Sequence, residues 1–188
     1  MGNDPAGVVA TTTSCGACKP AKPIWTNRAA NQDVHARCLV RPKTLEELRE
    51  VIREVSARKG RMKAVATGLS FSDILQTDDT LVVLTDLLAE TQPTGLLPLE
   101  DDLFHAGVPY TPRVRVIAGA RIRELNAALA RDGLAFTNLG GYDGQTLLGA
   151  ISTSTHGSGR GLGPLPDAVV SLDLVTTDGV IYRIEPSV

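Results

Sequence analysis

The amino-acid sequence predicts an α+β fold, and three features indicate it. Residues 44–60 form a strongly amphipathic segment, which is typical of a surface helix. Three short apolar segments predict strands, at 62–66, 81–87 and 114–119. Residues 168–185 alternate in polarity on both sides of Asp178-Gly179, which is the pattern of an antiparallel hairpin.

Composition and charge exclude several classes of protein. The chain has 188 residues, 43% of them hydrophobic, which is enough to bury one substantial core or two small ones. Its 19 basic and 21 acidic residues are spread evenly, so we expect neither a nucleic-acid partner nor a polybasic membrane anchor. No visible export signal opens the chain, and no apolar run approaches the roughly 20 residues of a membrane span. We therefore expect a cytoplasmic protein.

The first helix has clear start and stop signals. Thr44 and Glu47 have the spacing of a capping box, and Gly60 can supply the left-handed residue after the last turn. The apolar side chains between them recur on one helical face, at Leu45, Leu48, Val51, Ile52 and Val55.

The second helix is expected at about 121–132. Its apolar positions are Ile122, Leu125 and Leu129, and Gly133 ends it. The segment 91–112 contains prolines and predicts an irregular excursion. Residues 1–23 lack periodicity and predict a flexible N-terminal arm, which leaves one ordered domain at 24–188.

Three cysteines make an odd number, so a disulfide framework is a poor interpretation and a reducing compartment fits better. Cys15 and Cys18 have the spacing of a redox dithiol or of half a zinc site. No second pair follows, and Cys38 stands apart. A thiol-redox or zinc function at Cys15 and Cys18 is therefore an alternative hypothesis. The competing interpretation is that the two cysteines are simply small residues in a loose N-terminal arm.

Two polar, glycine-containing segments predict the site. TGLSFS at 67–72 follows an expected strand, and STSTHGSG at 152–159 follows the apolar stretch TLLGAI. Glycine lets the backbone approach a ligand closely, and consecutive amides in such loops can converge on phosphate oxygens. A diphosphate would suit two such loops, although each alone could be a connecting turn. Neither loop is a Walker A or a GxGxxG motif.

The order of these motifs adds a resemblance. VATGLSFSD, then LTDLL, then NLGGYDGQTLLGAISTSTHGSG and VVSLDLVTTDG resemble the FAD-binding (PCMH-type) domain of the vanillyl-alcohol oxidase flavoproteins. The likeness covers about 24–185 and is greatest to the sugar-1,4-lactone and alditol oxidase branch. It implies two small α/β subdomains with FAD between them.

The resemblance also implies an activity. The parent enzyme would be an oxidoreductase that transfers a hydride from a CH–OH group of a sugar lactone, polyol or related alcohol to flavin N5. In the family a substrate domain follows, so we expect a C-terminal domain or a second chain to complete the site. A non-catalytic scaffold that keeps the fold is the competing hypothesis, and no catalytic residue is predicted.

The cofactor-binding residues implied by the resemblance fall in the two loops and in the segment before the second. They are Ala64, Val65, Ala66, Thr67, Gly68, Leu69, Ser70, Phe71, Gly140, Gly141, Thr146, Gly149, Thr153, Ser154, Thr155, His156 and Gly157. His156 is expected to bind rather than to act as a base. Leu69 stands where many members of the branch have a histidine joined to the flavin, so we expect non-covalent FAD.

Overall fold

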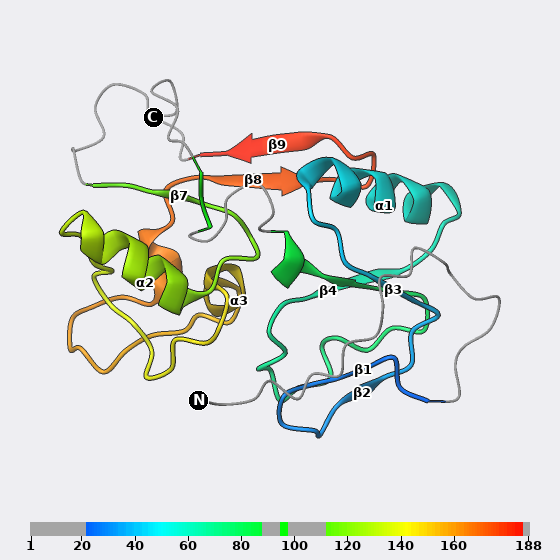
Figure 1. The fold of residues 1–188 in the computed structure, drawn as a ribbon, viewed down its shortest axis with the longest axis horizontal. Helices are drawn as coiled ribbons and strands as arrows, with labels where there is room; N and C mark the ends of the chain where they lie inside the picture. Colours follow the sequence, from blue (N-terminus) through cyan, green and yellow to red (C-terminus); the bar gives the residue numbers. More distant parts are fainter. Residues whose placement is uncertain (1–21, 88–94, 98–111, 186–188) are drawn as a thin grey trace.

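The structure, a computed structural model, describes residues 22–87, 95–97 and 112–185. Figure 1 shows two lobes side by side, an amino-terminal lobe (22–87) and a carboxyl-terminal lobe (112–185). The lobes share a core, because Ile117 and Ala118 pack against the buried cluster Val82, Leu84 and Leu87. The expected α+β class is confirmed, whereas most of the excursion predicted at 91–112 and most of the arm predicted at 1–23 lie outside the described residues.

A three-stranded parallel sheet forms the amino-terminal lobe. Its order is β3 (Cys38–Val40), β5 (Thr80–Val83) and β4 (Met62–Val65). A short antiparallel pair, β1 (Trp25–Thr26) and β2 (Asp33–Val34), precedes it. β5 is buried along its whole length, as expected for the central strand of a parallel sheet. The predicted strand at 81–87 ends early, because Leu84–Asp86 turns into a 3-10 helix.

The first helix is confirmed as α1 (Leu45–Ala57), with the Thr44 hydroxyl accepting from the Glu47 amide at 3.2 Å. The expected role of Gly60 is corrected. Lys59 takes the left-handed conformation (φ 53°), and the Lys59 and Gly60 amides close a Schellman motif on Ser56 and Val55. Gly60 is needed for space instead, since a Cβ there would lie 2.5 Å from Asp79 Oδ2.

The carboxyl-terminal lobe contains two helices. α2 (Ile122–Arg131) ends at Gly133 (φ 69°) as predicted, and α3 (Leu147–Ser152) is formed by the stretch TLLGAI. The strand expected at 114–119 is only β7 (Arg115–Val116), which pairs with β6 (Leu96–Leu97) before the chain turns at Ile117. A 3-10 helix, Leu165–Ala168, packs beside α3, and Ile122, Ala150 and Leu165 form the local core.

The predicted hairpin is confirmed as β8 (Leu172–Val175) and β9 (Ile181–Ile184). Gly179 (φ 75°) is the left-handed residue of a three-residue turn, and Asp178 accepts hydrogen bonds from Thr176 and Val180. Figure 1 shows the hairpin reaching toward α1, where Arg49 donates to the Gly179 carbonyl at 2.7 Å.

Cys38 is disulfide-bonded, which corrects the expectation that the thiols stay reduced. Cysteine spacing alone does not show which thiols meet in space, and Cys15 and Cys18 lie outside the described residues. Within the described part of the chain, no helix is long and apolar enough to cross a membrane.

Candidate cofactor-binding site

The first loop (residues 67–72) leaves the carboxyl end of β4 and carries no charged side chain. Gly68 adopts φ +68°, where a side chain is strained. The Trp25 ring also packs against this glycine, because a Cβ on Gly68 would lie 2.5 Å from Trp25 Cζ2. Conformation and space therefore both require glycine at position 68.

The carbonyl groups of the first loop face a neighbouring turn, residues 27–32. The Gly68 carbonyl accepts from the Arg28 amide at 2.9 Å, and the Ser70 carbonyl accepts from Asn27 Nδ2 at 2.9 Å. The Phe71 carbonyl accepts from the side-chain amides of Asn31 and Gln32, each at 3.2 Å.

The amides of the first loop are available to a ligand. Among the described residues, no acceptor receives a hydrogen bond from the backbone N–H of residues 67–72. Successive amides without protein partners form a nest suited to an anion. The hydroxyls of Ser70 and Ser72 lie 2.9 Å apart and hydrogen-bond to each other. One of the two hydroxyls thus keeps its donor free for a ligand.

The second loop (residues 152–159) follows α3, and several of its hydroxyls serve that helix. Thr146 is 1% exposed and accepts from the Gly149 amide at 3.2 Å, which makes it the N-cap of α3. Ser152 donates to the Leu148 carbonyl and Thr153 to the Gly149 carbonyl, at 2.8 and 3.1 Å. The hydroxyl donors of Ser152 and Thr153 are therefore already used within α3.

The next residues of the second loop leave more donors open. Ser154 is in the left-handed region (φ 53°), which turns the chain out of α3. Within the described residues, the amides of His156, Gly157 and Ser158 have no acceptor. His156 Nδ1 lies 2.9 Å from the Gly157 carbonyl and must donate to it, since a carbonyl only accepts. The imidazole thus holds its own loop, and a direct role of His156 in binding the cofactor stays a prediction.

The segment before α3 packs against the second loop. A Cβ on Gly140 would lie 2.8 Å from the Thr155 Cγ2 methyl, so the lack of a side chain at Gly140 lets the two segments pack this closely. Asn138 donates to the Gly163 carbonyl at 3.0 Å and accepts from the Leu139 amide. Gly141 has open space around its Cα. The structure therefore brings Gly140 together with Thr155, and Gly157 together with Asn138 and Leu139.

The remaining candidates differ in accessibility. Ala64 is exposed on β4 and Val65 is buried, whereas Ala66 and Leu69 are half-buried. Phe71 is 71% exposed, which is unusual for a large apolar side chain. An exposed ring beside free amides suits a ligand or a further protein surface.

Sequence reasoning missed the residues that hold the first loop, namely Trp25, Asn27, Asn31 and Gln32. The signal for the turn is the spacing of Asn27 and Asn31, since asparagine commonly closes turns through its side chain. Their contact with the first loop spans about forty positions and leaves no local pattern.

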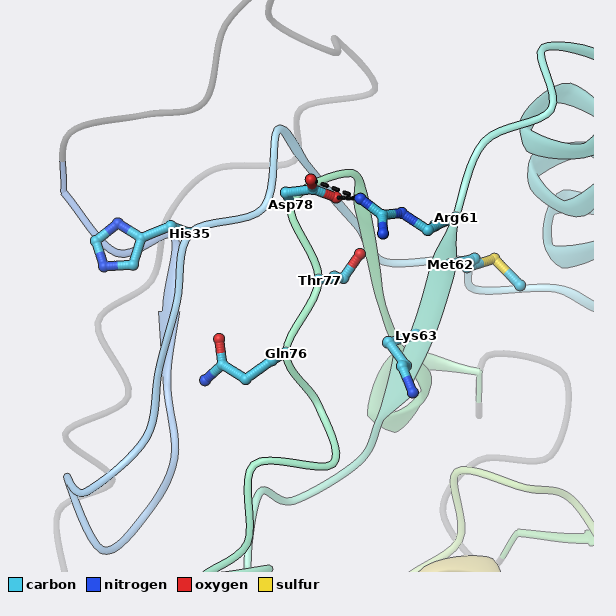
Figure 2. Close-up of a pocket in the computed structure, with 7 residues that line it drawn as sticks. All are labelled: His35, Arg61, Met62, Lys63, Gln76, Thr77 and Asp78. Atoms are coloured by element: carbon cyan, nitrogen blue, oxygen red, sulfur yellow. Dashed lines mark hydrogen bonds and ion pairs between the residues drawn. The ribbon is translucent and has the colours of Figure 1, made fainter.

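A pocket of about 350 Å³ lies elsewhere, beside β4, and is lined by residues that include His35, Arg61, Lys63 and Asp78. Figure 2 shows Arg61 reaching Asp78, and both carboxylate oxygens are 2.6 Å from Arg61 Nη2. The pair is largely exposed, so it stabilises the fold by less than about 1 kcal/mol. The pocket contains none of the predicted cofactor-binding residues.

Comparison with known proteins shows the family. Residues 36–185 match the family described as FAD binding domain. The chain belongs to this family. An FAD diphosphate carries negative charge, and the unpaired amides of both loops are the donors that it needs, so the residues present fit the cofactor.

Two characterised relatives show the branch. The chain is 36% identical over 165 residues to L-gulono-1,4-lactone dehydrogenase of Mycobacterium tuberculosis, covering 86% of this chain and 35% of that protein. It is also 36% identical over 162 residues to alditol oxidase of a Streptomyces species, with the same two coverages. The chain thus spans about a third of the length of these relatives, and the expected family is confirmed.

A solved structure supports the fold. A chitooligosaccharide oxidase superposes with a TM-score of 0.64 at 15% identity, covering 85% of this chain and 32% of the other. No group of three or more histidine, cysteine or acidic residues that could hold a metal occurs in the described parts of the chain. The thiol or zinc alternative at Cys15 and Cys18 lies outside those parts.

Proposed function

We propose that this chain is the FAD-binding part of an oxidoreductase that acts on a CH–OH group of a sugar lactone, polyol or related alcohol. The observation that carries the proposal is the first loop, whose amides have no described acceptor while its carbonyls are held by the 27–32 turn. The named activities of the relatives, a lactone dehydrogenase and an alditol oxidase, supply the substrate class.

The two loops would divide the binding of FAD between the lobes. The amides of Leu69, Phe71 and Ser72 would donate to the diphosphate, and those of His156 and Gly157 would donate from the other lobe. Thr153 and Thr146 would support the second loop through α3, because their hydroxyls are engaged there. When bound, FAD would supply a two-electron acceptor, so a CH–OH group could lose a hydride from carbon to the flavin and a proton from oxygen to solvent or a base, and become a carbonyl group.

The attachment of FAD is proposed to be non-covalent. Leu69 has no nucleophilic atom, so position 69 offers the flavin nothing to bond with. The test is acid precipitation of the purified flavoprotein, followed by absorbance of both fractions. We expect the flavin in the supernatant. Flavin that stays in the washed pellet would overturn this part of the proposal.

A further domain or chain is proposed to complete the substrate site. The hairpin has one face made of apolar side chains that are 46 to 54% exposed: Leu172, Leu174, Tyr182 and Ile184. The relatives have about two thirds of their length outside the part that this chain matches, and we propose that a corresponding domain packs on this apolar face. A cytoplasmic location is also proposed. Disulfides such as that of Cys38 are rare in the cytosol and count against this location, so fractionation of cells is the direct test.

The activity is tested by mixing the FAD-loaded, full-length protein with a panel of alditols and aldonolactones in the absence of oxygen. Bleaching of the flavin absorbance by at least one of them is the expected result. Full flavin loading without bleaching by any hydroxylated substrate would contradict the enzyme proposal and favour a scaffold that keeps the fold.

A further inference from the structure

The side chain of Asn27 is fully engaged in hydrogen bonds. It is 4% exposed. Its Oδ1 accepts from the amides of Asn31 and Gln32 at 3.0 and 3.1 Å, which closes the turn between β1 and β2. Its Nδ2 donates to Asn31 Oδ1 at 2.7 Å and to the Ser70 carbonyl at 2.9 Å. All four positions of the amide are satisfied, so the side chain has one fixed orientation.

The contacts of the 27–32 turn determine which way the first loop presents its amides. In a planar trans peptide, the C=O of one residue and the N–H of the next point in opposite directions. The carbonyls of Gly68, Ser70 and Phe71 are drawn toward the turn. The amides of the residues that follow them, Leu69, Phe71 and Ser72, therefore point away from it.

Asn27 has a central part in this arrangement. Its Nδ2 donates to the Ser70 carbonyl. Its Oδ1 accepts from the amides of Asn31 and Gln32, whose side chains donate to the Phe71 carbonyl. The Gly68 carbonyl accepts from the amide of Arg28, the residue that follows Asn27. Loss of the Asn27 side chain would therefore release the Ser70 carbonyl and loosen the turn that holds the Gly68 and Phe71 carbonyls.

We propose that Asn27 is the positioning residue of the first loop: without touching FAD, it orients the amides of Leu69, Phe71 and Ser72 toward the diphosphate. This inference rests on the proposed function, because it takes the first loop to be the diphosphate site. Trp25 gives a readout that needs no FAD. It is the only tryptophan of the chain, and its ring packs against Gly68.

The experiment compares the parent chain with Asn27→Ala and with the control Asn126→Ala. Asn126 lies on α2 and makes no hydrogen bond through its side chain within the described residues. Two quantities are measured: the Kd for FAD by titration, and acrylamide quenching of Trp25 fluorescence in the absence of FAD. We expect Asn27→Ala to raise the Kd by about tenfold or more and to increase quenching. Asn126→Ala should change neither.

The outcomes separate the two proposals. If the parent chain binds no FAD, the proposed function itself fails. If the parent binds FAD and Asn27→Ala binds it equally well, only the positioning role is overturned. A higher Kd with unchanged quenching would also overturn it, since Asn27 would then act on the cofactor directly.

A milder variant covers the case in which Asn27→Ala does not fold. Asn31→Ala with Gln32→Ala removes the two side-chain donors to the Phe71 carbonyl, together with the acceptors of Asn27 Nδ2 and of Gln76 at these positions. The bond from Asn27 to the Ser70 carbonyl stays, and Asn31 is exposed. We expect a smaller rise in Kd and in quenching, with cooperative thermal unfolding retained. A folded double variant with parental Kd and quenching would overturn the role of the turn.

Discussion

The two ends of the parallel sheet in the amino-terminal lobe use polar groups in opposite ways. At the amino end, where β3, β4 and β5 begin, Asp79 accepts from Arg37, Arg58 and the amide of Arg61 at 2.7 to 3.0 Å. At the carboxyl end of β4, the amides of the first loop donate to no described residue. One end is closed by pairing within the protein, whereas the other keeps its donors open.

Asp79 shows how strongly the amino end is paired. Burial raises the pKa of Asp79, but the hydrogen bonds from the Arg61 amide and from the guanidinium groups of Arg58 and Arg37 outweigh it. Together they lower the pKa to about 2. These bonds link the segments that start all three strands, so this end stabilises the sheet. The comparison teaches that the two ends of one sheet can differ in whether their polar groups are paired, and the unpaired end is the one where we propose that the ligand binds.

The largest effect is expected from Gly68→Val, at the open end. A Cβ at position 68 would strain the backbone (φ +68°) and meet Trp25 at 2.5 Å, so the first loop would move. FAD binding should weaken by more than about a hundredfold, close to complete loss in a titration. The control is Gly133→Val, which has the same left-handed strain (φ +69°) but open space. Retained stoichiometric FAD in Gly68→Val would contradict the assignment.

The second prediction extends the comparison to the other lobe. Thr155→Val removes a hydroxyl at similar volume and should cost about 1 to 3 kcal/mol of FAD binding if that hydroxyl meets the diphosphate. Thr153→Val should leave FAD affinity nearly unchanged and lower the thermal stability instead, because the Thr153 donor is bonded to the Gly149 carbonyl. Calorimetric titration and thermal unfolding of both variants measure this difference. Equal FAD affinities for Thr155→Val and the parent would refute the role of Thr155.

The third prediction concerns the closed end. Asp79→Asn should lower the free energy of unfolding by about 2 kcal/mol, because the lowered pKa of Asp79 shows that its charged form is stabilised by folding. FAD affinity should be unaffected. Asp78→Asn is the matched control, since Asp78 is exposed in its pair with Arg61 and should cost little. A loss of FAD affinity without a loss of stability in Asp79→Asn would reverse the comparison.

The smallest effect is the pH dependence of the closed end. The folded pKa of Asp79 is about 2 and the ordinary value is 3.8, so its stabilisation is present above the ordinary value. It is lost as the pH falls from there through the folded value. Denaturant unfolding of the parent should therefore lose stability over this window. In Asp79→Asn that part of the loss should be missing, and parallel pH curves would contradict the assignment.

The sequence predicted local elements well and contacts between distant segments poorly. α1, α2 and the β8–β9 hairpin each have caps or turn residues beside a periodic apolar pattern, so their signals are local. β1, β2 and β3 are only two or three residues long, too short for a periodic pattern, and β3 pairs with β5, about forty positions further along the chain. Lys59, not Gly60, is the left-handed residue after α1, and the contact of Gly60 with Asp79, nineteen positions away, leaves no local pattern either.

The site shows the same limit. Both loops were predicted from glycines and hydroxyls, yet hydroxyl content did not show which donors are free. Ser152 and Thr153 use theirs inside α3. The carbonyls of the first loop accept hydrogen bonds from the 27–32 turn, and its amides point the other way. That contact between distant segments leaves no local pattern in the sequence.

The central claim, that the open end of the sheet holds the FAD diphosphate, is tested most directly by a crystal structure of the protein with FAD. The quantity to measure is the distance from the diphosphate oxygens to the amide nitrogens of Leu69, Phe71 and Ser72. We predict at least two of these distances at about 2.7 to 3.2 Å, with the carbonyls of Gly68 and Ser70 still facing the 27–32 turn. A diphosphate bound elsewhere, with these three amides facing solvent, would contradict the account.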